Sequence, residues 1–472
     1  MIKWFWIFAG LFILLLVVVS TKAMKKNKSI NDFMLAGSSV GAILGILTYA
    51  AALFSAFIFI GIPDFFRVHG VGAWIFLAVA DGVMFFMMFW FGYHLRKKAR
   101  EIGYKGVAGM MSVIFKTRWA GIVVFIAAFI FLIPYVAIQI RGISMFFIAI
   151  FPNALPHYGW AILIISIMLL YSEIGGLKAI VFSDAIQAIL LLVVLSIIGY
   201  NSVKYFGNVE DLFNQVKEID PALLSTPGPK GLFTTQFLIA SFIAIILLPL
   251  SQPQFSSRIV IMKSMKETYK MAAGIGVVSV VVFISTAFIG MYGAARYSNA
   301  STQEFVQNAL LFDQPNVVAA LAIVGLFAAV LSTSNAQIFA LGSEFRSLLE
   351  GADEKANFKR TKIALFIFAL IVLVTSILIG DELVLLARMS FAGTSMIVPI
   401  VLIGVISKRK PGMEIIIFSA ISLLVFLLTL FNIIPSVLYN IRVDLGLYIL
   451  LLIMSLVSVL VRKTHSTEKQ SP

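Results

Sequence analysis

Long apolar runs constrain the fold of this chain more than any other feature. They recur along the whole sequence, and many reach the roughly 18 residues that a helix needs to cross a hydrocarbon core of about 30 Å. Only 12% of the residues are charged and 61% are hydrophobic, whereas a soluble domain carries about twice that charged share. The sequence therefore predicts an all-α polytopic membrane protein.

Charged and turn-rich breaks divide the apolar runs into about 13 transmembrane helices. Their expected limits are 3–21, 38–61, 71–95, 118–150, 157–171, 178–202, 232–252, 268–295, 315–343, 361–380, 386–406, 412–432 and 442–461. The 203–231 break is expected to hold a short amphipathic helix around VEDLFNQVKEI.

Basic residues gather at alternate breaks, and the remaining breaks are neutral or mixed. By the positive-inside rule the N-terminus lies outside and the C-terminus lies in the cytoplasm. The formal charge of +14 is thus explained by topology, without nucleic acid as a partner. The basic breaks contain Lys22, Lys25, Lys26 and Lys28; Arg96, Lys97, Lys98 and Arg100; Arg258, Lys263, Lys266 and Lys270; Arg346, Lys355, Lys359 and Arg360; and Lys408, Arg409 and Lys410.

One apolar run is interrupted by consecutive polar side chains, in FAAVLSTSNAQIFA at 327–340. On a helix Ala329, Ser332 and Thr333 share one face, so a carbonyl and two hydroxyl oxygens point the same way. Three neutral oxygens can form half of a site for a small hard cation. The alternative is that these hydroxyls bond their own backbone or allow close packing.

The second span contains the segment that could supply the other half. It carries small residues at 50–52, 55 and 56, and a break near Phe54 would free the carbonyls of Ala51 and Phe54. Unwound backbone inside a membrane occurs where it lines a cavity, and its carbonyls can bind Na+.

Ionisable groups within the spans are functional candidates because they are costly in lipid. Asp184 would need a cation or a proton at its depth. Asp81 and Arg141, the latter beside Gln139, either contact substrate or form interhelical pairs and crevice walls. Arg388 lies near a span end and is expected to extend toward the interface.

Four motifs in order make the chain resemble the sodium/solute symporter family, most closely its pantothenate, monocarboxylate and proline branch. They are ALFSAFIFIGIPDFFRVHG, YSEIGGLKAIVFSDAIQ, LSQPQFSSRIV and AAVLSTSNAQIF. The resemblance implies a LeuT-type fold with two inverted repeats of five helices, one extra N-terminal helix and two extra C-terminal helices. It also implies a location in the plasma membrane, as a multi-pass protein of a bacterial inner membrane. It divides the chain into an N-terminal helix and loop (1–37), a first repeat (38–202), an extracellular loop (203–231), a second repeat (232–406) and a C-terminal part (407–472).

By position, the resemblance implies a sodium site formed by the carbonyls of Ala51, Phe54 and Ala329 and the hydroxyls of Ser332 and Thr333. Relatives with a second sodium site use the aspartate that matches Asp184 and two serines, which are replaced here by Asn335 and Ala336. A second sodium is therefore not expected, and Asp184 and Asn335 are assigned to a second ion or to the exit path.

The solute is expected to be small and organic, and a carboxylate is favoured because Arg141 could bind one in bidentate fashion. The resemblance disfavours a sugar, because Ile58 replaces the glutamine with which sugar-carrying members contact their substrate, and Leu53 and Phe57 are apolar too. The candidate substrate contacts are Leu53, Ser55, Ile58, Leu77, Asp81, Gln139 and Arg141.

These features predict a sodium-coupled symporter that works by alternating access. Three alternatives stay open: a transporter-like sensor, a symporter of neutral amino acids, and a different coupling ion. A channel is disfavoured because no charged ring lines a pore. An enzyme is disfavoured because the chain has four His, no Cys and no nucleophile–base pattern.

Overall fold

The computed structural model describes residues 1–24, 39–104, 106–172, 176–349, 353–380, 382–407 and 412–468. Its elements in chain order are α1 (Ile2–Met24), α3 (Ala42–Leu53), the π-helix η2 (Phe57–Gly61), α4 (Ile62–His69), α5 (Ala73–Phe76), α6 (Ala78–Ile102), α7 (Val107–Phe115), α8 (Arg118–Ile150), α9 (His157–Ser172), α10 (Gly176–Phe206), α11 (Val209–Ile219), the 3-10 helix η3 (Pro221–Leu224), α12 (Thr235–Ile246), α13 (Leu248–Ser251), α14 (Pro253–Val260), α15 (Met265–Arg296), α16 (Thr302–Gln307), the π-helix η4 (Asn308–Phe312), α17 (Asn316–Ser347), α18 (Glu354–Leu378), α19 (Leu383–Ser395), α20 (Val398–Ile406), α21 (Met413–Leu430), β1 (Val437–Leu438), β2 (Ile441–Arg442) and α22 (Val443–Glu468).

The longer of these helices are apolar enough to cross a membrane. Nine qualify within the described residues, and eleven if two bent pairs are each counted as one span. The bent pairs are 42–53 with 57–69, inclined by 65°, and 383–395 with 398–406, inclined by 44°. Helices α9 and α12 are apolar but shorter, so the expected total of 13 remains a prediction.

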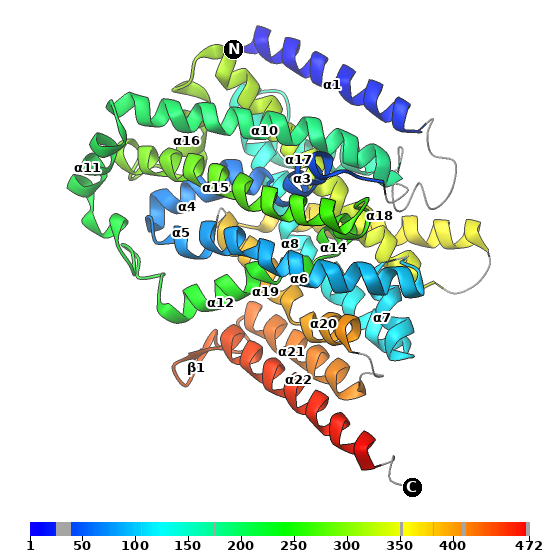
Figure 1. Cartoon of the computed structure of the whole chain (residues 1–472). Coiled ribbons are helices and arrows are strands. Elements are labelled where there is room, and N and C mark those ends of the chain that lie inside the picture. Colours follow the sequence, from blue (N-terminus) through cyan, green and yellow to red (C-terminus); the bar gives the residue numbers. More distant parts are fainter. Residues whose placement is uncertain are drawn as a thin grey trace.

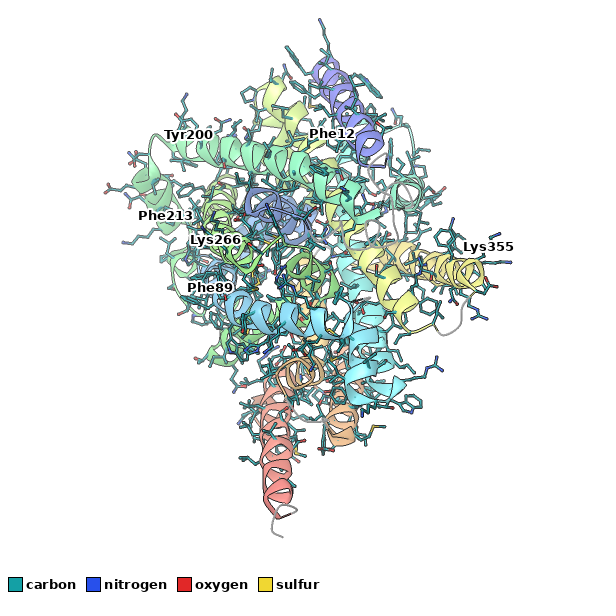
Figure 2. All side chains as sticks on the ribbon, turned by 45° about the vertical axis from the view of Figure 1, so that its right-hand side comes forward. Phe12, Phe89, Tyr200, Phe213, Lys266 and Lys355 are labelled. Carbon is teal, nitrogen blue, oxygen red and sulfur yellow. The ribbon has the colours of Figure 1, made fainter. Side chains whose placement is uncertain are left out.

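The centre of the bundle is formed by α17, whose apolar stretch is 78% buried, against 17% for α1 at the edge. Alanine and glycine are frequent on α17, and small side chains let neighbouring helices approach closely. In Figure 1, α1 lies along one flank and α21 and α22 along the opposite flank. Exposed side chains such as Tyr200 point away from the bundle (Figure 2), as expected of a surface that faces lipid.

The two ends of the bundle differ (Figure 1): α11 and the β1–β2 hairpin lie at one end and α7 at the other. Helix α11 spans the expected VEDLFNQVKEI segment, and the Asn208 side chain caps it by accepting from the Asp211 N–H. At the α7 end, the carboxylate of Glu344 on α17 accepts from the N–H groups of Val107 and Ala108. The first turn of α7 is therefore attached to the central helix.

Three arginines lie where the sequence did not predict them. Arg96 was expected in a basic break but is 4% exposed on α6, and its Nη1 donates to the Ile259 and Val260 carbonyls. Arg388 does not extend toward an interface: it is 8% exposed, and it pairs with Asp444 at the start of α22. Arg258 does not lie in an exposed break: it is 1% exposed on α14. For Arg388 and for Arg258, a carboxylate from a distant part of the chain offsets the desolvation cost of burying the guanidinium group.

Candidate functional site

The candidate site is built around a break in the first bent helix. Phe54 ends α3 with extended backbone (φ −94°, ψ 118°), and the chain becomes helical again within three residues. The break predicted near Phe54 is therefore present. Neither Gly nor Pro interrupts the helix at this point, so tertiary contacts must satisfy the backbone groups that the break releases.

Two side chains of α8 supply those contacts. The Tyr135 hydroxyl donates to the Leu53 carbonyl at 3.1 Å. The Gln139 side chain accepts from the Ala56 N–H at 2.9 Å and donates to Ser55 Oγ at 3.1 Å. Gln139, a predicted substrate contact, thus holds the break in place. Tyr135 was missed, although its position four residues before Gln139 puts both side chains on one face.

Opposite this break, α17 presents the two hydroxyls singled out in the sequence. Ser332 Oγ lies 3.1 Å from the Ala51 carbonyl oxygen and 3.0 Å from that of Ala329. Thr333 Oγ1 lies 2.9 Å from the Ala51 oxygen and 3.4 Å from that of Phe54. All five residues proposed as sodium ligands therefore meet in one buried cluster, the sodium cluster.

These separations of 2.9–3.4 Å are hydrogen-bond distances: the Ser332 hydroxyl donates to the Ala51 or the Ala329 carbonyl, and the Thr333 hydroxyl donates to the Ala51 or the Phe54 carbonyl. The hydroxyls therefore join α17 directly to the break, and the bond from Ser332 to Ala329 is the own-backbone bond that was the alternative for these residues. The oxygens are all neutral, the type that unwound membrane helices offer to Na+.

Asp184 lies close to this cluster but is not a lone carboxylate. Its Oδ2 accepts from Arg258 Nη2 at 2.9 Å and from the Thr48 hydroxyl at 2.6 Å. Arg258 Nε also donates to the Thr48 carbonyl at 3.1 Å. The cation that Asp184 was expected to need is therefore present within the chain. We call Asp184, Arg258 and Thr48 the inner network. Because Thr48 lies three residues before Ala51, one helical turn joins this network to the sodium cluster.

Asn335, assigned with Asp184 to a second ion or exit path, lies on α17 beyond Thr333 and is 1% exposed. Its side-chain oxygen makes no hydrogen bond within the described part of the chain, and neither does Asp184 Oδ1. These two buried oxygens are acceptors without a partner among the described residues.

A second break separates α13 from α14 at Gln252, which is extended (φ −114°, ψ 124°). The Gln252 side chain donates to Thr394 Oγ1 on α19 at 3.4 Å. One turn earlier on α19, the Phe391 ring packs 5.1 Å from that of Tyr135 and 6.5 Å from that of Phe57. One face of α19 thus contacts both breaks, a feature that the sequence alone did not reveal.

The remaining predicted substrate residues fall into two groups. Leu53, Ser55 and Ile58 are buried at the first break. Leu77 and Asp81 are buried where α5 passes into α6, and among the described residues the Asp81 carboxylate makes no hydrogen bond or ion pair.

Arg141 occupies a different face of α8. It follows Gln139 by two residues, or about 200° around the helix, so it faces away from the break. Its Nη1 lies 3.0 Å from Nε2 of His157 at the start of α9. This placement favours the interhelical pairing that was the alternative for Arg141.

Discontinuous helices that meet at a buried oxygen cluster define a secondary transporter of the LeuT type. The fold matches a Na+-coupled sialic acid symporter in a substrate-bound outward-open state, with a TM-score of 0.74 and 16% identity over 99% of this chain and 98% of that one. It also matches Mhp1, a nucleobase-cation-symport-1 family transporter in a closed conformation, with a TM-score of 0.52 and 16% identity over 92% and 95% of the chains.

The model of the sodium:solute symporter family matches residues 33–413, and the chain belongs to this family, whose coupling ion is Na+. A sodium/pantothenate symporter of Haemophilus influenzae is 27% identical over 44% of each chain, so the match spans under half of that relative. Its Escherichia coli counterpart is 22% identical over 68% of this chain and 67% of that one. The osmoregulated proline transporter OpuE of Bacillus subtilis is 22% identical over 85% and 83%. The family predicted from the motifs is confirmed.

Proposed function

We propose that this protein is a Na+-coupled symporter that imports a small carboxylate-bearing solute by alternating access. The observation that carries the proposal is the convergence of the Ser332 and Thr333 hydroxyls on the Ala51 and Phe54 carbonyls. The proposal assigns Na+ to this cluster, with the Ala329 carbonyl as its fifth ligand.

The break gives the coupling a direct physical route. The carbonyls of Ala51 and Phe54 accept from Thr333 on α17. In the same short segment, the Leu53 carbonyl and the Ser55 hydroxyl accept hydrogen bonds from side chains of α8. An ion that fixes the carbonyls on one side of the break also fixes the backbone on its other side. We place the solute between the two breaks, near α19. Solute and Na+ then favour the same conformation, so each raises the affinity for the other.

The carboxylate is supported by the relatives' solutes, because pantothenate and proline both carry one. Arg141 remains a candidate partner, but the N-terminal ends of the half-helices at the breaks are better placed to attract an anion. Loss of carboxylate uptake in Arg141→Ala would restore the arginine to the solute site, whereas unchanged uptake would remove it. Neutral sugars are not part of the proposal.

The inner network is the proposed closure on the cytoplasmic side, past which Na+ leaves along Asp184 and Asn335. The proposed orientation, with the N-terminus outside, makes the α7 end cytoplasmic. It is supported by Lys97 and Arg100, which are exposed near the end of α6 at Ile102, just before α7. It follows that α11 lies on the outer side.

Uptake into proteoliposomes tests the function. Pantothenate, proline and other labelled small carboxylates would be offered under an inward Na+ gradient or an equal K+ gradient. Ser332→Ala is expected to abolish Na+-driven accumulation. Ser334→Ala is the matched control, because Ser334 is equally buried and its hydroxyl bonds nothing in the described structure.

Other outcomes would contradict the proposal in distinct ways. Saturable binding without accumulation would indicate a transporter-like sensor. Accumulation that does not depend on Na+ would indicate another coupling ion, and equal losses in both serine variants would remove the sodium cluster from the explanation.

A further inference from the structure

A groove of about 610 Å³ opens on the surface of the bundle between α6 and α15. We call it the aromatic groove, because its lining consists of five aromatic rings and one imidazole. They are Phe86, Phe89, Trp90, Tyr93 and His94 on α6 and Tyr269 on α15. Figure 2 shows Phe89 of α6 and Lys266 of α15 on the same face of the molecule. The volume of the groove lies within the range of about 300–1,000 Å³ that is typical of small-molecule sites.

The two helices that form the groove run antiparallel in a defined register. The Phe89 ring lies 5.2 Å from the Tyr269 ring. One turn further along α6, a Cβ on Gly92 would lie 3.5 Å from the Thr268 side chain. After another turn, Arg96 donates to two carbonyls of α14, just before α15 begins. The end of α6 and the start of α15 therefore lie at the same end of the groove.

Two exposed lysines lie at this end of the groove. Lys97 is one turn beyond Tyr93 on α6, and Lys266 is one turn before Tyr269 on α15. Residues three or four apart share a helix face, so each lysine continues the face that carries the aromatic rings. Neither lysine forms an ion pair with a described residue. The groove therefore combines an apolar length with a positively charged end.

The kinds of side chain in the groove indicate the kind of molecule that fits it. Trp90, Tyr93 and Tyr269 are exposed, and Trp and Tyr are typical of the level at which the hydrocarbon core meets the lipid headgroups. At that level a phospholipid offers an acyl chain to the rings and a phosphate to the lysines. A soluble anion would leave the rings without a partner, and a zwitterionic lipid would bring its own cation close to the lysines.

We propose that the aromatic groove binds an anionic phospholipid, with one acyl chain against the rings and the phosphate bound by Lys97 and Lys266. This site lies on the surface of the bundle and shares no residue with the sodium cluster. It therefore does not depend on the proposed transport reaction.

Quenching of Trp90 fluorescence by brominated lipids tests the site in the full chain. The protein would be reconstituted in phosphatidylcholine vesicles with an increasing fraction of chain-brominated phosphatidylglycerol or chain-brominated phosphatidylcholine. The chain has six Trp, and the difference between wild type and Trp90→Phe isolates the Trp90 signal. Half-maximal quenching of Trp90 should need a roughly tenfold lower fraction of the brominated phosphatidylglycerol, because each lysine adds attraction for the anionic headgroup.

Two lysine variants test where the headgroup binds. Lys97→Gln combined with Lys266→Gln should remove the preference, so that both brominated lipids quench Trp90 at similar fractions. Lys270→Gln is the matched control, because Lys270 is exposed on the same helix but its ammonium pairs with Glu267 at 3.5 Å. This control should keep the preference of wild type.

Four results would overturn the proposal. Equal quenching of wild type by the two lipids would indicate an unselective lipid shell around α6. Absence of Trp90 quenching by either lipid would show that protein covers the groove, such as a second copy of the chain. A preference that survives in the double lysine variant would place the headgroup elsewhere. A preference that Lys270→Gln removes equally well would indicate only the general positive charge of this end of the bundle.

Discussion

Removing one hydroxyl from the sodium cluster should weaken Na+ binding by a calculable amount. Thr333→Val keeps the shape of the side chain but deletes the oxygen that lies 2.9 Å from the Ala51 carbonyl and 3.4 Å from that of Phe54. A polar contact to a charged group contributes about 1.5–3 kcal/mol. A loss of about 2 kcal/mol corresponds to a roughly 30-fold higher dissociation constant for Na+.

This change can be measured as protection against heat. At a Na+ concentration 100 times the wild-type dissociation constant, bound ion stabilises the fold by about 2.7 kcal/mol. In Thr333→Val the same concentration is only about threefold above the constant, so the stabilisation falls to about 0.9 kcal/mol. The assay is thermal unfolding of purified protein across a Na+ series, with K+ keeping the ionic strength constant.

Thr333→Ser is the matched control, because it retains the hydroxyl and should keep the Na+ midpoint within a few fold of wild type. The reasoning would be refuted if Thr333→Val remained folded and Na+ protected it with an unchanged midpoint. The hydroxyl would then have only a packing role, and the ion would bind elsewhere.

Three further predictions concern the contacts that hold the site. Asp184→Asn should destabilise the fold by about 3–5 kcal/mol, because it leaves Arg258 buried without its ion-pair partner. In thermal unfolding, adding Arg258→Gln should restore part of this stability. Strictly additive losses would show that the two residues are not coupled. Gln139→Leu should cost about 1–3 kcal/mol because the Ala56 N–H loses its acceptor, and uptake should fall with it; unchanged stability and uptake would contradict the role given to Gln139. Asp444→Asn should lower the melting temperature more than Arg442→Gln does, because Arg442→Gln leaves the buried ion pair between Arg388 and Asp444 intact. Equal losses of melting temperature would argue against a stabilising role for the Arg388–Asp444 pair.

Local patterns predicted much of the fold. The 118–150 and 209–219 helices were anticipated because an apolar run and an amphipathic period are both written in consecutive residues. The break near Phe54 was anticipated from a cluster of small side chains. The oxygen face of α17 was predictable because residues three and four apart on a helix must share a face.

Contacts between distant segments could not be predicted in this way. Arg258 looked like a loop cation because its partner, Asp184, lies 74 residues away and no local pattern links them. Gln139 looked like a solute contact because the Ala56 N–H that it bonds is 83 residues distant. Arg388 was misplaced for the same reason. In each case the sequence identified a polar group at membrane depth, but only the packing showed what satisfies it.

The attachment of α7 to Glu344 has a consequence for how ion binding could be observed. Glu344 follows Thr333 by eleven residues on one unbroken helix, a distance of about 16 Å along the axis. A tilt of α17 at the sodium cluster therefore displaces α7, which sits at the surface of the molecule. Val113 on α7 is 59% exposed, so a fluorophore there would lie outside the transport path. Na+ binding at the sodium cluster would then change the emission of this fluorophore, because α17 transmits its tilt to α7.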